Sequence, residues 1–125
     1  MYRLRGYDLM AFVPTGDLKR AKKFYWGVLG LHLVTEEAGL LVLDANGTPL
    51  RITEVDGLLP APYTILGWMV PDITASVFEL ESKGVVFERY KGFDQDEMGI
   101  CTLPDGARVA WFKDPDGNIL SLTQV

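Results

Sequence analysis

The sequence predicts an α+β fold that consists of two βαβββ-like halves. The same order of segments, a strand, a helix and three further strands, is found twice along the 125 residues. A Val-Pro pair precedes a helix-capping aspartate in both halves, at Val13 and again at Val70. Residues 56–62, with one glycine and two prolines, are typical of a linker. We therefore expect a single domain with module one at 1–55 and module two at 63–125.

The first module begins with a predicted strand at residues 7–14. Asp17 then offers an N-cap, because its carboxylate can accept a hydrogen bond from a backbone N–H of the first helical turn. Apolar residues at helical spacing follow it, and Gly30 is expected to end the helix. The remaining strands of this module are predicted at 31–36, 39–44 and 48–55.

The second module repeats the pattern with a strand at 63–70 and an N-cap at Asp72. Its helix, 73–83, is expected to stop at Gly84. Its remaining strands are predicted at 85–90, 107–113 and 118–124, and residues 91–106 are predicted to form a polar loop.

Composition excludes several classes of partner. A net charge of -5 argues against nucleic acid, which attracts basic surfaces. No 18-residue apolar run is present, so we expect no membrane span. Residues 1–17 lack the apolar core and the cleavage site of a signal peptide, which leads us to expect a cytoplasmic protein.

The counts of cysteine and histidine limit the possible chemistry. Cys101 is the only cysteine, which excludes an internal disulfide and a multi-thiolate zinc site. His32 is the only histidine, so one chain cannot assemble a site with two or three imidazole ligands. Neither a GxGxxG nor a GxxxxGK[ST] motif occurs, and we expect no nucleotide cofactor.

Two segments resemble the vicinal oxygen chelate superfamily, which groups glyoxalases, extradiol dioxygenases and bleomycin-resistance proteins. They are "DLKRAKKFYWGVLGLHL" at 17–33 and "WFKDPDGNILSL" at 111–122, within a match over about residues 7–124. The resemblance implies tandem βαβββ modules that form a curved mixed sheet around a cleft, with the helices on the outside. It also implies a homodimer, because many relatives are homodimers.

In metal-dependent members of that superfamily, four strands ligate a divalent ion. The matching positions here are Met10, Arg51, Ile65 and Ser121, with Ser121 where the family's turn would place a glutamate. Thioether, guanidinium, alkyl and hydroxyl groups provide neither imidazole nor carboxylate. We therefore expect no metal and no cofactor, and a protein similar to metal-free bleomycin-resistance proteins.

The cleft that the resemblance implies would be lined by every second residue of these strands, because neighbouring strand residues point to opposite faces. The surface is mostly apolar with a few polar points, which is typical of a small-molecule pocket. Alternatively, the same side chains fill a second core. The expected ligand-binding residues are Asp8, Met10, Phe12, Arg51, Thr53, Ile65, Met69, Trp111, Ser121 and Thr123.

Arg51 is the most informative of these residues, because a buried guanidinium needs an anionic partner. Three alternatives stay open: Asp8 on the first strand neutralises it, a ligand carboxylate or phosphate does, or Arg51 lies on a solvent-exposed rim.

Three functional hypotheses follow. The preferred one is a metal-independent protein that binds and sequesters a partly aromatic drug or metabolite, without catalytic residues. The alternative is a metal-dependent enzyme of glyoxalase, isomerase or dioxygenase type, in which carboxylates would replace the missing ligands. A third is metal-free acid/base catalysis by Asp8 or another carboxylate in the cleft.

Overall fold

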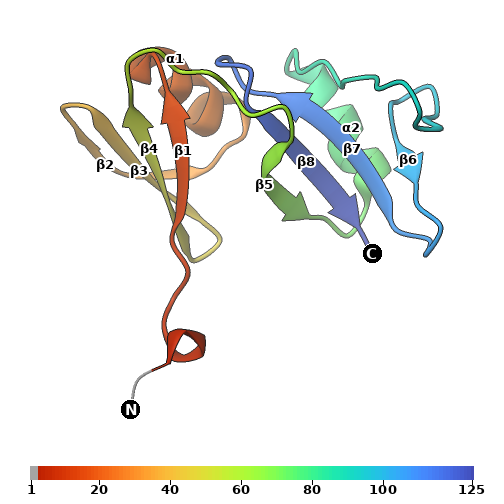
Figure 1. Cartoon of the computed structure of the whole chain (residues 1–125), viewed down its shortest axis with the longest axis horizontal. Coiled ribbons are helices and arrows are strands. Elements are labelled where there is room, and N and C mark those ends of the chain that lie inside the picture. The colour runs from red at the N-terminus through yellow and green to blue at the C-terminus, as the bar shows by residue number, and fades with distance from the viewer. Residues whose placement is uncertain (1–2) are drawn as a thin grey trace. The chain divides into compact units, whose positions relative to one another are not determined.

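The computed structural model describes residues 3–125, which fold as two compact units. The first unit ends at Leu59 and the second begins at Pro60, within the predicted linker. Each unit holds a four-stranded sheet and has the order βαβββ, which confirms the predicted α+β class (Figure 1). No helix within residues 3–125 is long and apolar enough to cross a membrane.

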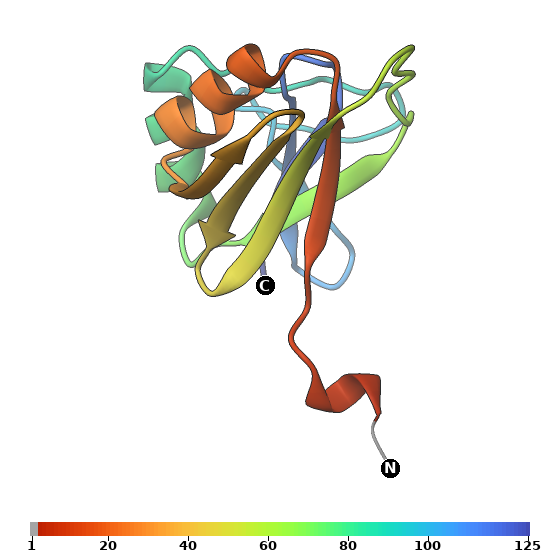
Figure 2. The same cartoon turned by 90° about the vertical axis from the view of Figure 1, so that its left-hand side faces the viewer.

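The first unit has the sheet order β1-β4-β3-β2, in which only the β1–β4 pair is parallel. Helical residues lie over one face of this sheet (Figure 2). Val13, Leu50 and Ile52 point to this covered face and are fully buried. The elements are β1 (Ala11–Thr15), α1 (Leu18–Lys22), η2 (Lys23–Val28), β2 (His32–Glu37), β3 (Leu40–Ala45) and β4 (Thr48–Glu54).

The first helix begins at the predicted cap. The Asp17 carboxylate accepts a hydrogen bond from the Arg20 amide at 3.2 Å. After Lys22 the helix widens into the π-helical segment η2, where the Leu29 amide donates to the Phe24 carbonyl at 2.8 Å. Tyr25, within this segment, is completely buried. The π-helical turn was not predicted, because side-chain periodicity does not distinguish it from an α-helix over so few residues.

The second unit has the sheet order β5-β8-β7-β6 and one parallel pair, β5–β8. The predicted cap is confirmed, because the Asp72 carboxylate accepts from the Ala75 amide at 3.1 Å. The Gln124 side chain ties the helix to β8 by accepting from the Ile73 amide at 2.8 Å. The elements are β5 (Thr64–Met69), α2 (Ile73–Ser82), β6 (Cys101–Thr102), β7 (Arg108–Lys113) and β8 (Ile119–Gln124).

The first strand is shorter than predicted. It begins at Ala11, which pairs with Leu50, and residues 4–6 form a short 3-10 helix, η1 (Leu4–Gly6). The register would place residues 7 and 8 opposite the turn that precedes β4, so no strand lies beside them in this unit. Residues 3–10 consequently run on beyond the end of the sheet (Figure 2).

Segment 85–90 is not a strand, contrary to the prediction. Its contacts with β7 include an isolated bridge between Phe87 and Phe112 and a bond of 2.7 Å from the Glu88 amide to the Trp111 carbonyl. The apolar alternation arose because Val85 and Phe87 are buried, not because the segment forms a ladder. The strand in its place is β6, within the region predicted as a loop.

Candidate ligand-binding site

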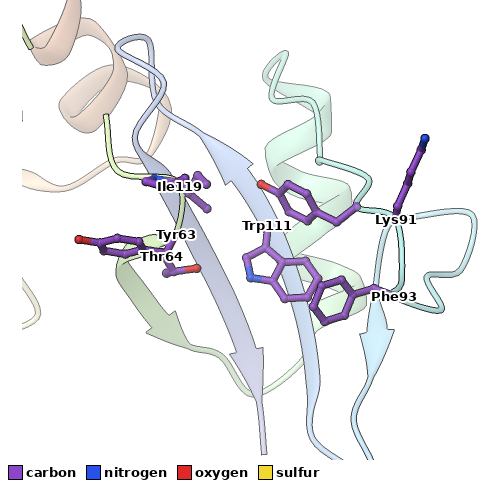
Figure 3. A pocket seen from close by; sticks show the side chains of 8 residues that line it. Tyr63, Thr64, Lys91, Phe93, Trp111 and Ile119 are labelled. Atoms are coloured by element: carbon purple, nitrogen blue, oxygen red, sulfur yellow. The ribbon is translucent and has the colours of Figure 1, made fainter. Parts of the chain in front are cut away.

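A pocket of about 440 Å³ lies in the second unit, beside the start of β5 and β8 (Figure 3). Trp111 of β7 lines it, and the neighbouring Phe112 is completely buried on the opposite face of the sheet. Most of the lining is aromatic or apolar. It consists of Pro62, Tyr63, Thr64, Tyr90, Lys91, Phe93, Trp111 and Ile119.

Trp111 is at the centre of an aromatic cluster. The Tyr90 ring meets it nearly edge-on, with centroids 5.6 Å apart and an interplanar angle of 76°. The Phe93 ring lies 5.1 Å from the indole with an angle of 54°. Such tilted arrangements are favourable, because they bring a positive ring edge toward a negative ring face. The cluster therefore provides a preformed surface for a planar, apolar molecule.

The Gln95 side chain organises the loop that carries Tyr90 and Phe93. Its oxygen accepts from the Tyr90 amide at 2.8 Å. Its nitrogen donates to the Glu88 carbonyl at 2.9 Å and to the Gly99 carbonyl at 2.8 Å. These bonds satisfy backbone groups that would otherwise need a strand partner, so the segment is ordered without a ladder.

The Asp-Pro-Asp-Gly-Asn turn fixes β7 against β8. One Asp114 carboxylate oxygen accepts from the amides of Asp116 and Asn118, both at 2.9 Å, and the other accepts from the Asn118 side chain at 2.8 Å. Asp114 and Asn118 are both buried. This network sets the register in which Trp111 pairs with Ser121.

The Tyr90 hydroxyl is buried and has no hydrogen-bond partner among residues 3–125. Burial raises the pKa of the Tyr90 phenol, and the negative charge of Glu88 raises it further. The group is therefore a neutral phenol at neutral pH.

A β-bulge changes which residue of β5 faces the pocket. Thr64 pairs with Ile119 but Leu66 pairs with Leu120, so Ile65 is the extra residue of the bulge. As a result Thr64 lines the pocket and Ile65 does not. Strict alternation along the sequence cannot reveal a bulge, which is why Thr64 was not among the predicted site residues.

Ser121 lies between Trp111 and Gly67 in the sheet, in register with both. A Cβ atom added to Gly67 would lie 2.5 Å from the Ser121 hydroxyl oxygen. The serine side chain thus packs over a bare glycine backbone and is 9% exposed. Met69 and Thr123 pair with each other farther along the same strands, and neither lines the pocket.

In the first unit, Phe12 and Arg51 are in register on the parallel strands β1 and β4. Phe12 is 62% exposed, and Thr53, two residues beyond Arg51, is also exposed. This face of the first sheet therefore presents an aromatic ring beside a guanidinium. Asp8 and Met10 precede β1 and do not belong to the sheet.

Asp8 does not neutralise Arg51. No ion pair or hydrogen bond joins the two side chains in the part of the chain from residue 3 to 125. The shorter first strand explains this, because Phe12, not Asp8, is the residue opposite Arg51. A ligand anion and an exposed position remain the two interpretations of this arginine.

The sequence profile of the Glyoxalase/Bleomycin resistance protein/Dioxygenase superfamily matches residues 8–122. The chain belongs to this superfamily. Comparison with proteins of curated function gives no match.

Solved structures of the superfamily share the fold of this member. One from Sphaerobacter thermophilus DSM 20745 is 25% identical and has a TM-score of 0.75, with 95% of this chain and 97% of that chain covered. An antibiotic binding protein from Streptomyces sp. CB03234 is 26% identical, with a TM-score of 0.70 and 94% of both chains covered. A lactoylglutathione lyase from Agrobacterium tumefaciens, 17% identical with a TM-score of 0.73 and coverages of 94% and 92%, shares the fold.

The residues of this superfamily member do not fit a divalent ion at the four strand positions. No group of three or more histidine, cysteine, aspartate or glutamate side chains suited to a metal occurs within residues 3–125. Arg51 brings a permanent positive charge, and Ile65 has no donor atom. The Ser121 hydroxyl packs against Gly67. These four positions therefore do not form a site for a divalent metal ion.

Proposed function

We propose that this protein binds a small, partly aromatic drug or metabolite without a metal ion, and that it acts by sequestering this molecule. The aromatic cluster around Trp111, in a pocket of about 440 Å³, is the observation that supports the proposal. Pockets of this size hold small molecules, and apolar walls with few polar groups favour binding by shape and stacking.

The comparisons are consistent with this proposal at the level of the superfamily. The Streptomyces protein that is 26% identical over 94% of this chain is described as antibiotic binding. Superfamily members also include enzymes, but the similarity to the lactoylglutathione lyase is at 17% identity and concerns the fold alone. The poor fit of Met10, Arg51, Ile65 and Ser121 to a metal favours binding over metal-dependent catalysis.

We further propose that the protein acts as a homodimer in the cytoplasm. Each sheet ends in two edge strands, β1 and β2 in the first unit and β5 and β6 in the second. Edge strands present unpaired backbone groups that a second copy can cover. Light scattering on the purified protein would give twice the 13.9 kDa mass of one chain if this is correct.

A thermal-shift screen tests the proposed function. Planar aromatic compounds at fixed protein concentration should raise the melting temperature, since a ligand that binds only the folded state stabilises it. Trp111→Ala should abolish the shift. Trp26→Ala is the matched control, because Trp26 is half exposed in the first unit and contacts Lys22 instead of the pocket. Equal shifts for both variants would contradict the pocket assignment.

A further inference from the structure

The indole N–H of Trp111 is a hydrogen-bond donor in the pocket that no protein group uses. No hydrogen bond joins the indole nitrogen to another group within residues 3–125, where Trp111 makes ring contacts with Tyr90 and Phe93. In the same range, the Tyr90 hydroxyl is the only side-chain polar atom of a buried or half-buried residue that is both shielded from water and unpartnered. The unpartnered N–H of the half-buried Trp111 is therefore not shielded, and water or a ligand can reach it.

This N–H is directed toward the β5 side of the pocket. Figure 3 shows the indole nitrogen on the edge of Trp111 that is turned toward Thr64, and the Thr64 hydroxyl turned toward Trp111. β8 lies between β5 and β7, so two strand spacings, about 10 Å, separate the backbones of the two residues. Ile119 of β8 lines the pocket in this interval. A ligand that lies over β8 can consequently place an atom in front of the N–H.

The chemistry of the indole N–H limits the ligand atom that can meet it. An indole nitrogen donates a hydrogen bond and cannot accept one, so the complementary atom carries a lone pair. The pocket walls near this edge, which include Pro62, Tyr63 and Ile119, are mostly apolar. A ligand without an acceptor would bury the donor and remove its hydrogen bonds to water without replacing them. A ligand that covers this edge of Trp111 is therefore bound best when it has an acceptor atom at this position.

We propose that the ligand of this pocket is an aromatic compound with a hydrogen-bond acceptor at the edge of its ring system, and that this acceptor binds the Trp111 indole N–H beside Thr64. The inference rests on the proposed function, because it concerns the same pocket, and it narrows the ligand class to acceptor-bearing aromatic compounds. Trp111 then provides both apolar contact area and the direction of binding.

Quinoline and naphthalene are two probes of nearly equal shape that differ in this acceptor. Quinoline has an unprotonated ring nitrogen at neutral pH, and naphthalene has a CH group in its place. Proton–nitrogen correlation NMR of the isotopically labelled protein resolves the indole N–H signals of its three tryptophans, and the variants Trp26→Phe and Trp111→Phe assign them. Saturating quinoline should move the Trp111 proton signal farther downfield than naphthalene does, because hydrogen bonding deshields the proton. The Trp26 signal should not respond, since Trp26 does not line the pocket.

The ratio of the two dissociation constants gives a second readout. Trp111→Phe keeps an aromatic ring but removes the N–H. Isothermal titration should show that the ratio of the naphthalene to the quinoline dissociation constant falls about threefold to tenfold from its wild-type value, the range expected for one neutral hydrogen bond. Phe93→Leu is the matched control, because it removes a ring 5.1 Å from the indole and no polar atom. It should weaken both probes alike and leave the ratio unchanged.

The outcomes separate this inference from the proposed function. If both probes bind but shift the Trp111 signal equally, or if Trp111→Phe leaves the ratio unchanged, the acceptor inference is wrong and the aromatic pocket stands. If neither probe binds the wild type at its solubility limit, the acceptor-bearing ligand class is wrong. A blank in the broader thermal-shift screen as well would overturn the proposed function.

Discussion

Tyr90 shows at the scale of a single residue how burial controls protonation. Its pKa is raised first by burial and then by the charge of Glu88, so the folded state disfavours the phenolate. The unfolded chain releases this proton at a lower pH than the folded protein. The contribution of Tyr90 to stability is therefore complete below the ordinary tyrosine pKa and is lost as the pH rises through the raised value.

We predict that an alkaline titration will detect this shift. The difference in absorbance at 295 nm between the wild type and Tyr90→Phe should give a midpoint above that of an ordinary tyrosine. The wild type should also lose more unfolding free energy than Tyr90→Phe over the same pH range. A midpoint at or below the ordinary value would mean that the ring is solvated.

The close contact between Gly67 and Ser121 gives a second prediction about single residues. A methyl group at position 67 would approach the Ser121 hydroxyl oxygen to 2.5 Å, but the Ser121 Cβ only to 3.8 Å. Gly67→Ala should therefore be less favourable in the wild type than in a Ser121→Ala background, with a coupling of about 1 kcal/mol. Chemical denaturation of the wild type, the two single variants and the double variant measures this coupling energy. Additive effects would show that the serine rotates away without cost.

Among the site residues, the sequence predicted Trp111 but not Tyr90 or Phe93. The alternating pattern of a regular strand was enough to place Trp111 on the face that carries Ser121, and the structure places it in the pocket. Tyr90 and Phe93 reach the pocket through a loop whose path depends on hydrogen bonds of Gln95. Such a path has no periodicity, so pattern analysis could not place these two side chains.

At the scale of elements, the loop from residue 88 to 99 is an ordered part of the site. Gln95→Ala removes three hydrogen bonds and should lower the unfolding free energy by about 1–3 kcal/mol, because partly buried backbone groups lose their partners. It should also weaken binding of aromatic ligands. Hydrogen exchange at the Tyr90 amide, followed by mass spectrometry, should become faster.

Gln124→Ala is the matched control for Gln95→Ala. It removes the bond to the Ile73 amide of α2 and should also reduce stability. The α2 N-terminus is not part of the pocket lining, so the affinity for aromatic ligands should be unchanged. If both glutamine variants weakened binding equally, the loop would have no specific role in forming the pocket.

The turn between β7 and β8 is the second element with a defined role. Asp114→Ala removes the carboxylate that accepts three hydrogen bonds and should cost about 2–4 kcal/mol of unfolding free energy, since part of this network is buried. Thermal denaturation measures this. Asp94→Ala, at an exposed position without these bonds, should cost little by comparison.

Element prediction succeeded where local chemistry decides the structure. The prediction of both capping aspartates was correct, because a cap depends on side-chain hydrogen bonds within one helical turn. It failed for segment 85–90, where burial of Val85 and Phe87 imitates a strand. The two-residue strand β6 is too short to have a period.

At the scale of the whole molecule, the duplicated βαβββ order was visible in the sequence and accounts for both units. A repeat of this kind is detectable because capping residues, glycines and strand lengths recur together. Membership of the superfamily follows from the match over residues 8–122. A shared fold does not determine function, which depends on the side chains of a particular site.

We propose above that an aromatic pocket of this protein binds its ligand without a metal ion. The most direct measurement is isothermal titration of an aromatic ligand from the thermal-shift screen into the purified protein, before and after treatment with EDTA, together with metal analysis of the same sample. We expect the same affinity in both titrations, loss of binding in Trp111→Ala, and no stoichiometric divalent ion. Binding that disappears with EDTA and returns with a divalent cation would contradict it.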